Sequence, residues 1–88
     1  MDLDRPWILH PQVSVRPEPF GALLYHFGTR KLSFLKDRTL LSIVESLADA
    51  PNALAACTAA GVPDSEIARY GAALATLEQS RMLVERAS

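Results

Sequence analysis

The first third of the chain carries the hydrophobic pattern of three extended strands. Residues 12–16 alternate between apolar and polar side chains, which is typical of a half-buried strand. Two prolines within residues 17–19 predict a loop, because proline cannot donate to a sheet ladder in mid-strand. Residues 20–27 are almost continuously apolar, as expected for a central strand flanked on both sides. Residues 28–30 supply a tight, glycine-containing connection, and residues 31–35 resume the extended pattern at the open edge of an antiparallel sheet.

The spacing of apolar residues becomes helical after residue 37. Asp37 is placed to cap a first helix, which ends before Pro51. Asn52 is placed to cap a second, alanine-rich helix, and Gly61 follows its end. Pro63 opens a third helix, whose first turn holds acidic side chains that favour the helix dipole. The apolar stripe of that helix consists of Ile67, Tyr70, Leu74 and Leu77.

The two ends of the chain are predicted to be extended. Pro6 and Pro11 exclude a regular helix from residues 1–11, so an N-terminal arm is expected there. Residues 80–85 are expected to pack back on the core as a short extended piece. Residues 12–85 should form one domain, because a chain of 88 residues supports a single core. The predicted fold is α+β, a three-stranded antiparallel sheet followed by three helices.

Composition and charge narrow the functional classes. Hydrophobic residues make up 49% of the chain and charged residues 22%, which is the balance of an ordinary folded domain. Nine basic and ten acidic residues give a net charge of −1, so no nucleic-acid partner is expected. No stretch approaches the roughly 20 apolar residues that span a bilayer, so no membrane contact is expected. The single cysteine and the absence of a secretion signal indicate a cytoplasmic location.

The residues that most often carry catalysis or metal binding are scattered along the sequence. His10, His26 and Cys57 fall in the arm, a strand and a helix, without the ligand spacing of a metal site. Cys57 lies among alanines and is expected in the core. His26 lies beside a turn with no carboxylate or nucleophile paired to it, which favours a structural role over titration. The chain is therefore expected not to be an enzyme and to bind no cofactor.

Two features remain as candidates for binding. Unpaired backbone groups of residues 31–35 could hydrogen-bond an incoming extended peptide, while alternate side chains set specificity. The third helix could form the opposite wall of a groove beside that edge, although a stripe at helical spacing is most often plain core. The candidate peptide-binding residues are Lys31, Leu32, Ser33, Phe34, Leu35, Tyr70, Ala73, Leu74 and Leu77.

Nearly the whole chain, from about His10 to Val84, resembles a known family. The resemblance is carried by the segments HPQVSVRPEPFGALLYHFGTRKLSFLKDRTLL, AAGV and ALATLEQSRMLV. They are similar to the mycofactocin-system precursor-peptide-binding chaperones, small members of the PqqD-like group of recognition elements for ribosomally made, modified peptides. The resemblance implies a PqqD-like, winged-helix-type fold, and a protein that presents a precursor peptide to a radical SAM maturase. In that family the leader of the peptide adds as an antiparallel strand against the third strand and packs on the third helix. These positions correspond to Lys31–Leu35 and roughly Tyr70–Leu77 here.

Two alternatives to peptide delivery remain open at this point. The exposed edge could instead pair or exchange strands with a second copy, which would give a homodimer in which residues 7–9 take part. A sheet with three helices also matches a DNA-binding winged helix. The third helix argues against DNA, because residues 64–79 carry three acidic side chains against the single basic Arg69 and would repel phosphates.

Overall fold

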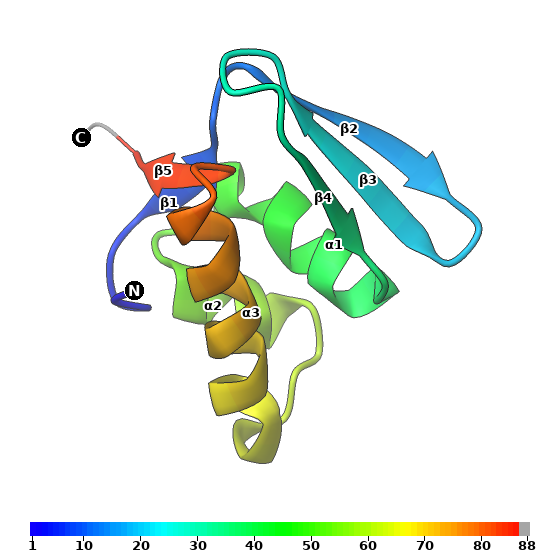
Figure 1. The fold of residues 1–88 in the computed structure, drawn as a ribbon. Helices are drawn as coiled ribbons and strands as arrows, with labels where there is room; N and C mark the ends of the chain where they lie inside the picture. Colours follow the sequence, from blue (N-terminus) through cyan, green and yellow to red (C-terminus); the bar gives the residue numbers. More distant parts are fainter. Residues whose placement is uncertain (87–88) are drawn as a thin grey trace.

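A three-stranded antiparallel sheet forms one layer of the protein, with helices on one of its faces (Figure 1). The computed structural model describes residues 1–86. The strands of this sheet are β2 (Val13–Glu18), β3 (Gly21–His26) and β4 (Leu32–Leu35), in the order β2-β3-β4. The predicted central position of β3 is confirmed, because it pairs with β2 on one side and β4 on the other. The predicted edge position of β4 is confirmed as well.

The loop predicted for residues 17–19 is wrong, because β2 runs through Pro17 to Glu18. Pro17 lies opposite Ala22 in the β2–β3 register. The Phe27 amide donates to the Gln12 carbonyl at 2.9 Å, and hydrogen-bonded pairs alternate with non-bonded pairs along an antiparallel ladder. Gln12 and Phe27 therefore form a hydrogen-bonded pair, and the alternation along the register makes Pro17 and Ala22 a non-bonded pair. In such a pair the backbone nitrogen of residue 17 points away from β3, toward the outer edge of β2. Proline therefore costs this ladder no hydrogen bond, which explains why the strand continues.

A second, two-stranded sheet joins the two ends of the chain. Strand β1 (Trp7–Leu9) pairs antiparallel with β5 (Leu83–Glu85), and Ile8 lies opposite Val84. Trp7 is only 7% exposed, and its indole N–H donates to the Asp2 carbonyl at 2.8 Å. The hydrophobic pattern predicted the extended backbone of the C-terminal piece, but it did not predict this pairing. The N-terminal segment is thereby held against the core.

Capping side chains mark the starts of the first two helices, whereas the predicted opening of the third helix at Pro63 is a 3₁₀ turn, and the α-helix itself begins at Ile67 without a side-chain cap. The bounds of the helices are α1 (Arg38–Ser46), the 3₁₀ turn η1 (Leu47–Asp49), α2 (Ala53–Ala59), the 3₁₀ turn η2 (Asp64–Glu66) and α3 (Ile67–Gln79). The Asp37 carboxylate accepts from the Thr39 and Leu40 amides, and the Asn52 side chain accepts from the Ala55 amide. Gly61 follows α2 with a φ of 86°, the left-handed conformation that glycine adopts without strain. The predicted N-caps and the C-terminal glycine are confirmed.

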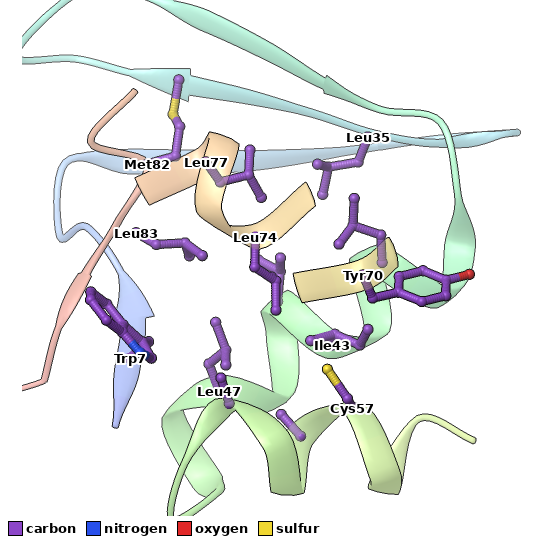
Figure 2. Packing of buried hydrophobic residues seen from close by; sticks show 14 of the residues in the cluster. Trp7, Leu35, Ile43, Leu47, Cys57, Tyr70, Leu74, Leu77, Met82 and Leu83 are labelled. Atoms are coloured by element: carbon purple, nitrogen blue, oxygen red, sulfur yellow. The ribbon is translucent and has the colours of Figure 1, made fainter. Parts of the chain in front are cut away.

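One hydrophobic core lies between the inner face of the β2-β3-β4 sheet and the helices (Figure 2). From the sheet, Leu24 and Leu35 enter it with 1% exposure or less. Met82 and Leu83 are equally buried, which confirms that the C-terminal piece packs on the core. Cys57 is fully buried among these side chains, as predicted, and burial raises the pKa of its thiol. The core thus draws on every helix and on both sheets.

Gly21 permits the close approach of β3 and β4. A Cβ atom at this position would overlap the Leu35 carbonyl oxygen, which belongs to the backbone and has little room to move. We expect Gly21→Ala to lower the free energy of unfolding by about 2 kcal/mol and the melting temperature by about 10 °C. Thermal unfolding followed by circular dichroism measures this.

Gly71→Ala is the matched control for that substitution. Its Cβ would meet only the end of the Leu3 side chain, at 3.3 Å, and alanine favours the helix by about 1 kcal/mol. We expect its melting temperature to stay close to that of the wild type. Equal melting temperatures for the two variants would contradict the proposed contact between the backbones of β3 and β4.

Candidate functional site

The free edge of β4 is the main candidate binding feature of the described residues. Within residues 1–86, β4 pairs with β3 on one side and with no strand on the other. The His26 amide donates to the Lys31 carbonyl at 3.0 Å, which identifies His26 and Lys31 as a hydrogen-bonded pair. Alternation along the register then directs the backbone groups of Ser33 and Leu35 toward β3. The N–H and C=O groups of Leu32 and Phe34 point to the free edge.

The side chains of β4 divide between two faces of the sheet. Leu32 is 61% exposed and Phe34 51% exposed, and both lie on the face away from the helices. Leu35 is 1% exposed and points into the core, and Ser33 is half-buried on the same face. Lys31 precedes the strand and is exposed. The alternation of burial therefore shows which side chains of β4 point outward and which point toward the core, a question that the sequence alone left open.

The predicted binding residues of α3 are mostly core residues. Tyr70, Leu74 and Leu77 are at most 6% exposed, and they belong to the same buried cluster as Leu35. Ala73 is half-buried and packs against that cluster. Figure 2 shows Leu35, Leu77 and Tyr70 close together beneath the sheet. Leu35 of β4 thus shares one buried cluster with the side chains of α3, and Ser33 and Ala73 are the half-buried members of the predicted set.

A hydrogen bond joins α3 to the segment that follows β4. The Tyr70 hydroxyl donates to Asp37 Oδ2 at 2.6 Å, while Asp37 Oδ1 accepts from the first amides of α1. The bond from Tyr70 lowers the pKa of the Asp37 carboxyl below its ordinary value, and the two amide bonds act in the same direction. The same bond raises the pKa of Tyr70. Asp37 therefore acts as a helix cap and as the acceptor that positions α3.

We expect Tyr70→Phe to lower the free energy of unfolding by about 1 kcal/mol at neutral pH, because a partly buried hydrogen bond to a charged group is lost. The Asp37 pKa is depressed in the folded state, so the stabilisation is present above the unfolded value of 3.8 and is lost as the pH falls below it. Urea titrations at pH 7 and pH 3 should therefore give a difference between the two proteins that shrinks in acid. Tyr25→Phe, on the half-buried outer side of β3, is the control. A difference independent of pH would contradict this role of Asp37.

His26 has a structural environment at the turn between β3 and β4. Its Nδ1 accepts from the Gly28 amide at 3.0 Å and from the Thr29 amide at 3.2 Å, and the residue is 2% exposed. Its Nε2 is buried and has no hydrogen-bond partner in the part of the chain that the structure describes. The His10 ring lies against it, with ring centroids 4.4 Å apart. This arrangement orders the turn, in agreement with the structural role favoured for His26.

Other surfaces offer little chemistry. No group of three or more potential metal ligands occurs among residues 1–86, and no helix described there could cross a bilayer. A hollow of about 730 Å³ between α1, α2 and the turn that joins β2 to β3 includes none of the predicted binding residues. Sequence reasoning missed the exposed outer face of the sheet, where Leu23, Tyr25 and Phe27 repeat at every second position. The alternation of these large side chains could have indicated an exposed apolar face, but the residues between them are also apolar, so the segment looked like a fully buried strand.

The antiparallel sheet, its free edge and the three helices define a small α+β domain of the PqqD-like class. The model of the peptide chaperone MftB family matches residues 6–84. This chain therefore belongs to the peptide chaperone MftB family, which confirms the resemblance seen in its sequence.

Three relatives named peptide chaperone MftB support this membership. The relative from Mycobacterium ulcerans is 69% identical, over 94% of this chain and 76% of its own length. The one from Mycobacterium tuberculosis is 64% identical, over 97% and 78% respectively. The one from Mycolicibacterium smegmatis is 65% identical, over 94% and 81%. No solved structure matches this chain significantly.

Proposed function

We propose that this protein binds the leader of the mycofactocin precursor peptide as an added antiparallel strand on β4 and presents the peptide to a radical SAM maturase. The observation that carries the proposal is the unpaired edge of β4 beside α3. Relatives named peptide chaperones, at 64 to 69% identity, agree with a role in peptide binding. The maturase supplies the chemistry in this scheme, and the chaperone is not an enzyme. We place the encounter in the cytoplasm.

The edge offers hydrogen bonds in a fixed pattern. Leu32 and Phe34 together present two N–H donors and two C=O acceptors to an incoming strand. A ladder of this kind tolerates many peptide sequences, so specificity must come from side chains. The short length of β4 limits the number of bonds, which suits a carrier that must release its peptide.

Side-chain selection would occur on the inner side of the added strand. A peptide side chain pointing toward α3 would meet Ser33 and Ala73, the half-buried members of the candidate set. Leu35, Tyr70, Leu74 and Leu77 support that contact from within the core. Peptide side chains on the other face would lie beside Leu32 and Phe34. Lys31 stands at the start of the strand, where its charge favours an acidic group of the leader.

Leu32→Pro tests the proposed ladder directly. Proline removes an N–H that points to the free edge and leaves the hydrogen bonds between β3 and β4 intact. We expect the affinity for a synthetic leader peptide, measured by isothermal titration calorimetry, to fall about tenfold. Leu32→Ala also removes the leucine side chain but keeps the N–H, so it should lose much less affinity than the proline variant. Equal affinities for the proline and alanine variants would exclude a ladder through Leu32.

Amide exchange gives a second readout of the same ladder, without substitution. Leader binding should slow exchange at Leu32 and Phe34, whereas Ser33 and Leu35 are already bonded to β3 and should change little. The opposite pattern, or no change along β4, would count against strand addition on this edge.

A second copy of the chain could also occupy the free edge, since β4 offers the same backbone groups to any extended partner. If the edge receives the leader, light scattering should show a monomer when the peptide is saturating. A dimer that persists with bound peptide would show that the edge of β4 serves self-association instead.

A further inference from the structure

The face of the β2-β3-β4 sheet that points away from the helices is uncovered, and its part over β3 and β4 is apolar, whereas β2 adds Ser14 and Arg16 to it (Figure 1). We call it the outer aromatic face. Its members are Phe20, Leu23, Tyr25, Phe27, Leu32 and Phe34. The four most exposed of these side chains have between 51% and 61% of their surface accessible. A contiguous exposed patch of this kind on a small domain marks an interaction site.

Ring contacts and strand register make this face continuous. Phe20 and Phe34 stack with centroids 5.5 Å apart at one end. Tyr25 and Phe27 meet edge to face at 5.0 Å at the other end. Between them, Leu23 lies opposite Phe34, and Tyr25 lies opposite Leu32. The rings hold one another in place, so a partner would lose little side-chain entropy on docking, and aromatic residues are frequent hot spots of interfaces.

The segment of sequence that carries this face has a net positive charge. Residues 14–38 contain five basic and two acidic residues, a net charge of +3, whereas the rest of the chain has four basic and eight acidic residues, a net charge of −4. The basic residues of the segment are Arg16, Arg30, Lys31, Lys36 and Arg38. Two of these basic residues are engaged elsewhere, because Arg16 pairs with Glu18 at 3.4 Å and Arg38 begins α1 and lines the hollow beside it. Arg30, Lys31 and Lys36 remain as exposed cations, while Asp37 caps α1. A complementary partner would carry apolar side chains with acidic groups around them.

Two other occupants fit this face less well. A second copy would bring the same positive charge against itself, which costs association energy. An anionic bilayer would attract the basic rim, but docking there would carry the unpaired backbone groups of Leu32 and Phe34 toward hydrocarbon, where they find no partner. A protein surface can either offer hydrogen-bond partners to those backbone groups or leave them accessible to water.

We propose that the outer aromatic face is the docking surface for the radical SAM maturase, through an apolar patch with an acidic rim on that enzyme. This inference rests on the proposed function, because it takes the maturase as the partner. A strand added to β4 would extend the same face with its own outward side chains. The docked enzyme would then contact the peptide and its carrier side by side, while the inner side of the added strand remains on α3.

The double variant Phe20→Ser/Phe27→Ser tests this surface without altering β4. Both positions are more than half exposed, at 53% and 60%, so the fold should be retained, and circular dichroism checks this. We expect the affinity for purified maturase, measured by biolayer interferometry, to fall at least about tenfold. Affinity for the leader peptide should fall much less than affinity for the maturase, because the backbone groups of Leu32 and Phe34 that form the ladder are unchanged. Wild-type binding to the maturase should also weaken as salt rises.

Leu54→Ser is the matched control, since Leu54 is a 38% exposed leucine on α2, away from the sheet. It should bind both partners like the wild type. Unchanged affinity of the double variant for the maturase would overturn the proposal, as would an equal loss of leader and maturase binding. Binding of the wild type to phosphatidylcholine–phosphatidylserine vesicles that the double variant loses, with maturase affinity unchanged, would assign the face to a membrane instead. Failure of the wild type to bind the leader would refute the proposed peptide site alone, because maturase binding is measured separately.

Discussion

The position of β4 depends on what happens at its C-terminal end. Leu35 is buried in the core, and its carbonyl lies so close to Gly21 that no side chain fits between the two strands. Two residues later, Asp37 caps α1 and accepts the hydroxyl of Tyr70 from α3. One short segment thus joins the sheet to two helices. This junction fixes the position of β4, which in the described part of the chain pairs with β3 on one side and with no strand on the other.

An unpaired strand edge can pair with unrelated chains, and two features of this sequence discourage such pairing. Strand β4 has only four residues, and Lys31 and Lys36 flank it. Short length and lysine charge both discourage indiscriminate pairing between sheet edges. The edge therefore remains available to an extended partner of suitable sequence. The backbone alternation also separates two surfaces, because Leu32 and Phe34 give their main-chain groups to the edge and their side chains to the outer aromatic face.

The function that we propose for this member of the peptide chaperone MftB family would use both surfaces. A carrier needs one site for its peptide and another for the enzyme that receives it, and a domain with one core has few faces to offer. The edge of β4 and the outer aromatic face adjoin each other but use different groups. In the proposed arrangement the peptide would use the main-chain groups of β4 and the enzyme would use the outward side chains, so both could bind at the same time.

The sequence by itself determined the features that arise from local chemistry. Asp37, Asn52 and Gly61 mark helix ends because capping involves residues only a few positions apart. The central position of β3 followed from its continuous apolar pattern. The tertiary structure decided the rest. The pairing of Trp7–Leu9 with Leu83–Glu85 joins three-residue strands from opposite ends of the chain, too short and too distant for any periodic signal. The passage of β2 through Pro17, and the outward direction of Leu32 and Phe34, depend on ladder register, which is fixed only when the strands meet and one face is buried.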